Sequence, residues 1–359
     1  MKSIRQMGAV AIAALLLTAC NPVKMKMHTT IYADGSCIRD VSYSNVMPKA
    51  MRDSVWPDGK TGWSQPMPEC LNIDAFCKSH TDIGKGDTVT TTFSCPFSNV
   101  EEMCGQTPLQ LNGTRLKSKA KLDKRFRWFY TDYTFTETFL CVGDTFKLDA
   151  KTYANKDIVS YWFTGEPNLV QGLSGAEASL KLNEIEPFVS RWLNDNLFKV
   201  VFDYVVSRYD SIPSPPVSRE RFCELHDSLF NHLVQDRDDL LLYAHAGDAF
   251  RDFFHSDAYG MFFDDETPLG KELNTELCNR LNIFWFNVPY TLTMPGTVID
   301  TGRGTQYGDI IFYPFTGERL IPGDYTVTAT SRVTNYWAYV VTLLVMAIAV
   351  TSIFYRRKK

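Results

Sequence analysis

The 359 residues, of which 45% are hydrophobic and 13% aromatic, suffice for one large domain or two smaller ones with their own cores. The 37 basic and 41 acidic residues give a formal net charge of −4. This balance excludes a strongly basic chain, so we expect no nucleic acid among its partners.

The first residues follow the pattern of a bacterial lipoprotein signal. Two basic residues precede a short apolar run, and the run closes on Leu17-Thr18-Ala19-Cys20. An uncleaved transmembrane helix is the alternative, but the run has about 13 apolar residues where roughly 17–25 are needed. The sequence therefore predicts a signal peptide over residues 1–19 and a lipidated Cys20 that carries acyl chains such as palmitate.

The last residues contain a longer apolar segment. No charged residue lies between Tyr336 and Tyr355, and four basic residues follow. At about 1.5 Å per residue the segment spans roughly 30 Å, the thickness of a bilayer's hydrocarbon core. Aromatic residues at both ends suit the membrane interfaces. We expect a transmembrane helix over 335–355 and a cytoplasmic basic tail over 356–359.

The two ends together predict a protein that is held to one membrane at two points. A single spanning helix is typical of the bacterial inner membrane, because outer membranes hold barrels instead. We expect the bulk of the chain on the periplasmic side and the C-terminus in the cytoplasm. The expected partners are membrane lipid, through the acyl anchor and the helix, and an envelope protein.

The residues between the two ends predict an α+β fold. A β-rich domain is expected from both ends of the chain, over 20–165 and 282–334, with a mostly helical insertion over 166–281. Asp34-Gly35 between alternating segments is a hairpin signal. A turn at Asp123-Lys124 is expected to join two long strands. The other expected strands are 88–94, 283–294, 308–315 and 323–332.

Capping signals place the helices. A short helix over 99–104 is expected to open at Ser98 or Asn99. Asn183 and Glu186 resemble a capping box, and apolar residues follow in steps of three and four, so a long helix is expected from Asn183. Ser218 is expected to cap the next helix, and a further helix is expected around 269–281.

Nine cysteines are present, and lipidation of Cys20 leaves eight. An even number in an exported chain favours disulfides over free buried thiols. Zinc is disfavoured because no Cys-x-x-Cys pair occurs. The preferred disulfides join neighbours in the sequence: Cys70–Cys77, Cys95–Cys104 and Cys223–Cys278.

Two features are candidates for lipid contact. A basic row, Arg115, Lys117, Lys119 and Lys121, is a candidate site for anionic lipid head groups. The alternative, which we favour, is a solvated strand face on which lysine discourages edge pairing. Aromatic residues over 126–139 could line a lipid cavity, but a filled core is the commoner use of such residues.

No motif predicts catalysis. His245 and His255 lie in an acidic stretch, where a solvated loop is favoured over a cation site. The sequence contains no Gly-x-Ser-x-Gly elbow, no His-Glu-x-x-His and no phosphate loop. We therefore expect no enzyme activity, no metal site and no cofactor.

One stretch has a resemblance to a known family. The segment Met294-Pro295-Gly296-Thr297-Val298-Ile299-Asp300-Thr301, with Gly308-Asp309-Ile310-Ile311-Phe312 after a short loop, resembles the LppM-type domain of bacterial envelope lipoproteins. Gly302 fits this family, whereas Phe312 stands where a Trp is common. The opening segment Ile31–Ser36 is also similar. The resemblance covers about 30–50 and 284–359 and implies a β-rich envelope domain that contacts lipids, with no catalytic residues to transfer.

The expected function is non-catalytic binding of a lipid or an envelope partner beside the inner membrane. A structural subunit of a membrane protein complex is the first alternative. An envelope hydrolase or transferase with an unrecognised site is the second.

Overall fold

The chain forms two compact units. The computed structural model describes residues 24–49, 68, 70–74, 76, 78–84, 87–142, 145–234 and 245–357. The β unit contains the described chain up to Leu140, then Asn287–Thr316 and the chain from Asp324 onward. The helical unit contains Cys141–Phe286 and Gly317–Gly323. The expected α+β class is therefore confirmed.

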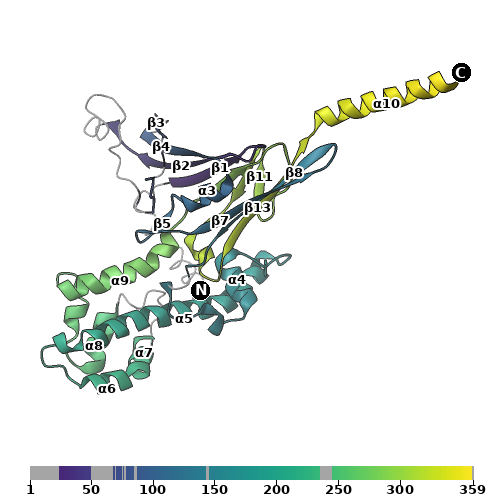
Figure 1. The fold of residues 1–359 in the computed structure, drawn as a ribbon. Helices are drawn as coiled ribbons and strands as arrows, with labels where there is room; N and C mark the ends of the chain where they lie inside the picture. The colour runs from purple at the N-terminus through teal and green to yellow at the C-terminus, as the bar shows by residue number, and fades with distance from the viewer. Residues whose placement is uncertain are drawn as a thin grey trace. The chain divides into compact units, whose positions relative to one another are not determined.

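Three sheets form the β unit (Figure 1). The seven-stranded sheet has the order β11-β12-β9-β1-β2-β4-β3, and the four-stranded sheet has the order β10-β13-β8-β7. A two-stranded sheet pairs β5 with β6. The strands are β1 (Lys24–Ile31), β2 (Cys37–Val46), β3 (Lys78–Ile83), β4 (Thr88–Phe97), β5 (Gln110–Leu111), β6 (Thr114–Arg115), β7 (Ser118–Phe126), β8 (Tyr130–Phe139), β9 (Tyr290–Thr293), β10 (Thr297–Asp300), β11 (Thr305–Tyr307), β12 (Ile310–Tyr313) and β13 (Tyr325–Thr334).

The first hairpin lies where the sequence predicts it. β1 and β2 pair antiparallel around Asp34-Gly35, and Gly35 has a φ of 102°, a conformation that glycine adopts without strain. β1 also pairs in parallel with β9 from the far part of the chain. The two ends of the chain thus meet in one sheet.

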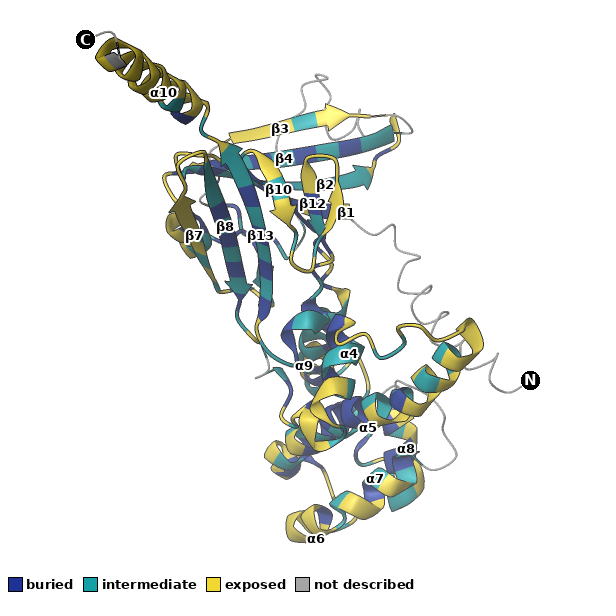
Figure 2. Cartoon of the chain, turned by 90° about the vertical axis from the view of Figure 1, so that its right-hand side faces the viewer, coloured by how far each residue is buried: buried dark blue, intermediate teal, exposed yellow. Residues whose placement is uncertain are grey.

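The inner faces of the two large sheets form the core of the β unit. Buried and partly exposed residues alternate along β2, β4, β8 and β13, as the banding in Figure 2 shows. Phe139 of β8 contacts Tyr290 of β9 and Phe315, with ring centroids 6.2 and 4.4 Å apart. One apolar face per sheet therefore packs on the other.

Two strand predictions need correction. β7 does not turn at Asp123-Lys124 but continues to Phe126, which pairs with Thr131 of β8. Both residues stay paired with β8, Asp123 with Thr134 and Lys124 with Tyr133, so the strand pairing outweighs the local turn signal. The strand expected over 283–294 is only β9, because the preceding helix continues to Trp285.

The helical unit contains α4 (Lys156–Thr164), α5 (Gly175–Ser207), α6 (Arg219–Glu224), α7 (His226–Val234), α8 (Ala246–Phe254) and α9 (Pro268–Trp285). Short 3-10 turns accompany them at Ala150–Thr152, Tyr209–Ser211, Gly260–Phe262 and Gly317–Leu320. Helix α3 (Val100–Gly105) lies in the β unit with Asn99 as its N-cap, and Ser218 caps α6, both as expected. The helical unit begins earlier than residue 166, because α4 precedes that position.

The start of α5 differs from the prediction. The capping box is formed by Ser174 and Glu177, whose side chains each bond the other's backbone N–H, so Asn183 lies inside the helix. Residues 175–184 are rich in Ala, Leu, Lys and Glu, which favour helix without an apolar stripe. A search for apolar periodicity therefore misses this first part of α5.

Aromatic side chains fill the core of the helical unit. Trp192 of α5 is 1% exposed, packs on Phe146 and Phe163, and donates its indole N–H to the carbonyl oxygen of Leu148 at 2.8 Å. A second group surrounds Phe222, which contacts Phe202, Tyr209, Phe250, Phe254 and Tyr259. The expected buried stripe of α5 is confirmed from Trp192 to Val205, whereas Phe188, expected in the same stripe, is 44% exposed.

We expect Leu197→Ala in α5 to lower the free energy of unfolding by about 2–5 kcal/mol, because the buried side chain leaves a cavity. Arg191→Ala on the exposed side should change it by no more than about 0.5 kcal/mol. Denaturant titration of the purified protein measures both values. Equal losses for the two variants would contradict the packing of α5.

Candidate membrane-facing site

Helix α10 (Tyr336–Arg357) follows the last strand of the β unit directly. In the described part of the chain it is the one helix long and apolar enough to cross a membrane, over Tyr336–Arg356. Its apolar side chains are exposed almost throughout (Figure 2). Only Asn335 separates β13 from α10. The helix and the β unit are therefore joined without a flexible linker.

Asn335 ties this junction to the turn between β7 and β8. Its backbone N–H donates to the carbonyl oxygen of Phe129 at 2.8 Å. Its side-chain amide donates to the carbonyl oxygens of Arg127 and Trp128 at 2.9 and 3.3 Å, and it accepts a bond from Thr131 at 3.2 Å. One side chain thus connects strand, helix and hairpin turn.

The hairpin tip, which we define as residues 126–129, packs on the first turns of α10 (Figure 1). The rings of Phe126 and Trp128 lie 6.4 and 5.4 Å from that of Trp337. Phe129 lies 4.7 Å from Tyr339. The indole N–H of Trp128 donates to the hydroxyl of Thr342 at 2.8 Å. Five aromatic side chains therefore gather where the apolar helix begins.

The aromatic strand divides into two parts. Phe135 and Phe139 are fully buried in the β unit, as expected of core residues. Phe126 and Trp128 are 58% and 47% exposed, so the core interpretation is wrong for the hairpin tip. The sequence signal that distinguishes them is position, because the exposed rings lie beside the turn and the buried ones follow the inward alternation of β8.

The basic row does not form a single surface. Arg115 lies on β6 and donates to Asn72 at 2.5 Å and to Asp74 at 3.4 Å. Lys119 and Lys121 lie on β7, an edge strand, and are exposed, and Lys121 pairs with Asp123 at 2.7 Å. Lys117 lies between the two strands. These positions suit the protection of a sheet edge.

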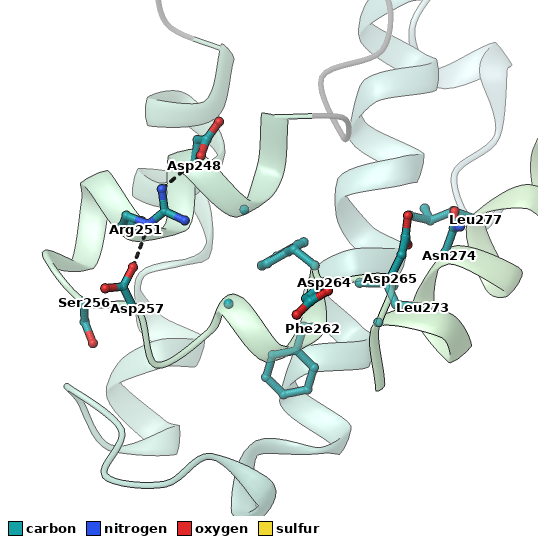
Figure 3. Close-up of a pocket in the computed structure, with 14 residues that line it drawn as sticks. Asp248, Arg251, Ser256, Asp257, Phe262, Asp264, Asp265, Leu273, Asn274 and Leu277 are labelled. Atoms are coloured by element: carbon teal, nitrogen blue, oxygen red, sulfur yellow. Dashed lines mark hydrogen bonds and ion pairs between the residues drawn. The ribbon is translucent and has the colours of Figure 1, made fainter. Parts of the chain in front are cut away.

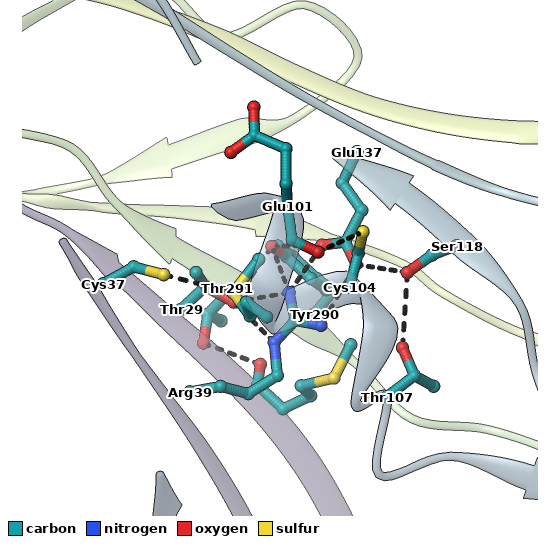
Figure 4. Close-up of polar contacts among 12 residues, drawn as sticks. Thr29, Cys37, Arg39, Glu101, Cys104, Thr107, Ser118, Glu137, Tyr290 and Thr291 are labelled. Atoms are coloured by element: carbon teal, nitrogen blue, oxygen red, sulfur yellow. Dashed lines mark hydrogen bonds and ion pairs between the residues drawn. The ribbon is translucent and has the colours of Figure 1, made fainter. Parts of the chain in front are cut away.

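A buried ion pair connects the two large sheets (Figure 4). Arg39 of β2 donates to both carboxylate oxygens of Glu137 of β8, at 3.0 and 2.5 Å, and both side chains are 0% exposed. Arg39 also donates to Thr29, and the Tyr290 hydroxyl donates to Glu137 at 3.0 Å. Ser118 donates to the other carboxylate oxygen at 3.0 Å.

Burial and the neighbouring carboxylate shift the pKa values of Arg39 and Tyr290. Burial by itself would lower the pKa of Arg39, but the Glu137 carboxylate more than offsets this, so the pKa of the guanidinium is raised. Burial, followed by the charge of Glu137, raises the pKa of Tyr290 well above its usual value. The arginine stays charged and the phenol stays neutral. Arg39, Glu137 and Tyr290 are fully buried, and their contacts join the two large sheets.

An acidic pocket lies in the helical unit, within the stretch that contains His245 and His255 (Figure 3). Its volume is about 380 Å³, and its polar lining includes Asp248, Asp257, Asp264, Asp265 and Asn274. Arg251 pairs with Asp257 at 2.7 Å and with Asp248 at 3.2 Å. This arginine offsets one of the four aspartate charges of the lining. No group of three or more His, Cys, Asp or Glu in the described residues is arranged to hold a metal ion.

The disulfide predictions are wrong wherever the structure describes both cysteines. No disulfide joins cysteines of the described chain. Cys95 lies on β4, and its thiol faces the carbonyl oxygen of Pro96, whereas the thiol of Cys104 bonds Glu101 in its own helix. Cys278 likewise bonds Asn274 of α9 rather than Cys223 of α6.

Two cysteine predictions lie outside the described residues. The first concerns Cys20, which lies with the whole signal segment outside the described residues. The second concerns Cys77, the expected partner of Cys70, which lies outside them as well. The thiol of Cys70 faces the sulfur of Met25 at 3.2 Å.

No protein-family model, no curated protein and no solved structure matches the chain. The resemblance to the LppM-type domain therefore stays a prediction that depends on the residues quoted for it.

We expect Glu137→Leu to lower the free energy of unfolding by about 3–5 kcal/mol, because Arg39 is left buried and unpaired. Glu137→Leu combined with Arg39→Met removes both charges and should recover most of this loss. Lys121→Gln, which breaks an exposed pair, is the control and should change stability by less than about 1 kcal/mol. Denaturant titration in detergent measures all three. An undiminished loss in the double variant would contradict the role of the pair.

We expect a maleimide at pH 7 to modify Cys223 in the folded protein without reductant, because its thiol is exposed. Burial raises the pKa of Cys37 to about 11, so this thiol should react only after unfolding. Peptide mass spectrometry locates the adducts. A Cys223 that reacts only after reduction would restore the disulfide prediction for Cys223 and Cys278.

Proposed function

We propose that the chain is a membrane-anchored envelope protein without catalytic activity, whose β unit works at the outer surface of the bacterial inner membrane. The observation that carries this proposal is the junction at Asn335. A folded unit that ends one residue before an apolar helix must lie close to the membrane that the helix crosses. Binding of lipid or of an envelope partner is the activity that suits this position.

The basic residues that follow Tyr355 support an orientation with α10 ending in the cytoplasm. Lipidation of Cys20 is the second part of the anchor. A single acyl chain holds a protein only marginally, whereas acyl chains together with a spanning helix hold it permanently. The two anchors would limit the β unit to the membrane surface.

A structural subunit of a membrane complex is the second candidate, and one observation favours it. The first turns of α5 leave Leu180, Leu182 and Phe188 exposed, at 65%, 39% and 44%. Leu173 just before the helix is also exposed. Large apolar side chains on one helix are typical of a contact surface for another protein.

The test joins two measurements on the full-length protein in a bacterial host. A cytoplasm-active reporter fused after Lys359 should be active, because the basic tail stays inside. Cys20→Ala should abolish incorporation of labelled palmitate but leave the chain in the membrane fraction, since α10 remains. Native purification with mass spectrometry of bound lipids and proteins then separates the two candidates.

Activity of a periplasm-specific reporter at Lys359 would overturn the orientation. Loss of the Cys20→Ala chain from the membrane would show that α10 does not span. A stoichiometric protein partner that contacts α5 would favour the structural subunit over lipid binding.

A further inference from the structure

The hairpin tip, residues 126–129, differs from an ordinary exposed turn. Turns in water are usually polar, whereas this one carries three large aromatic side chains, Phe126, Trp128 and Phe129, beside two arginines. Soluble surfaces rarely gather apolar side chains in this way without a partner to cover them. The nearest apolar surface is α10, which the three rings already contact.

The turn carbonyls and the indole N–H of the tip are satisfied inside the protein. All three turn carbonyls, those of Arg127, Trp128 and Phe129, accept hydrogen bonds from Asn335. The Trp128 indole donates to Thr342, whose hydroxyl in turn donates to the carbonyl oxygen of Ala338 at 2.7 Å. A turn in water needs no such partners. A turn in lipid does, because nothing in the bilayer replaces them.

The contact of Trp128 with Thr342 shows how far along α10 the hairpin tip reaches. Thr342 lies six residues after Tyr336, which is about 9 Å along the helix. Since Tyr336–Tyr355 is only long enough for the hydrocarbon core, Tyr336 lies no higher than the head-group layer, which is roughly 5–8 Å thick on each side. Trp128 therefore reaches at least the level at which tryptophan prefers to lie, between the head groups and the acyl chains.

We propose that the hairpin tip is a second membrane contact, which inserts Phe126, Trp128 and Phe129 into the outer interfacial layer of the bilayer crossed by α10. The ligand is lipid, with the aromatic rings among the upper acyl chains and the exposed Arg125 and Arg127 beside head-group phosphates. This inference depends on the proposed membrane-spanning role of α10. It places the lipid contact at the tip rather than on the basic row.

Lipid is favoured over a protein as the occupant because the tip is continuous with the lipid-facing surface of α10. Ala338 lies between Trp337 and Tyr339, which the tip contacts, and is fully buried, and a side chain this small lets the hairpin approach the helix closely. Tip and helix therefore form one apolar surface. Whatever covers the outer turns of α10 must also cover the tip.

The test uses the full-length protein in vesicles of phosphatidylcholine and phosphatidylglycerol. A benzoylphenylalanine is placed at position 128, with one control at Leu344 in the middle of α10 and another at Tyr307 of β11. Tyr307 is an exposed aromatic residue of the same unit, 67% exposed. After irradiation, mass spectrometry should find lipid adducts at 128 and 344 and none at 307.

The controls separate the two proposals. Adducts at 344 without adducts at 128 would overturn the hairpin contact and leave the spanning helix intact. Absence of adducts at both positions would overturn the spanning role of α10 as well. A crosslink from 128 to a second copy of the chain, in place of lipid, would show that a protein covers the tip.

Discussion

The ion pair between Arg39 and Glu137 is the constraint on which the β unit depends. Removing two charges from water has a large desolvation free energy. Only their mutual contact and the hydrogen bonds from the surrounding hydroxyls offset it. A small shift of one sheet along the other would break the paired contacts of guanidinium and carboxylate. The pair therefore selects one arrangement of the two sheets, a role that apolar side chains of similar size fill less strictly.

Glu137 also lies on the strand that carries the hairpin tip. β8 pairs with β13 over ten consecutive positions, from Tyr325–Phe139 at one end to Thr334–Tyr130 at the other. Along its outer face three pairs of threonines are joined by hydroxyl contacts of 3.0 to 3.2 Å. At the end near α10, Arg332 pairs with Asp132 and lies 3.8 Å above the ring of Tyr130. This stiff pair of strands connects the buried charges to the junction with α10.

Much of this organisation can be read from the sequence, because it depends on local patterns. The first hairpin, the apolar helix at the end and the buried stripe of α5 each follow from residue spacing. The position of the hairpin tip does not follow from the sequence, because the local turn signal at Asp123-Lys124 competes with strand pairing, which no local pattern reports. The early start of α5 does not follow either, because its first turns have helix propensity but no apolar stripe.

The buried ion pair has a signal in the sequence. Arg39 stands between Cys37 and Val41, and Glu137 between Phe135 and Phe139, so both occupy inward positions of their strands. Opposite charges at core positions of two separate strands predict each other as partners. No sequence pattern predicts how far along α10 Trp128 reaches, because that position depends on how β8 meets the helix.

The parallel pairing of β1 with β9 also sets an order of folding. His28 and Thr291 are partners although 263 residues separate them, so the large sheet stays open while most of the chain is still being made. Most contacts among the helices are closer in sequence, although Gly317–Gly323 completes their unit only after β12, whereas distant strand pairing is slow and leaves sheet edges uncovered. β13 then arrives with α10 only one residue behind it. The strand that joins β10 to β8 and the apolar helix are therefore made one directly after the other.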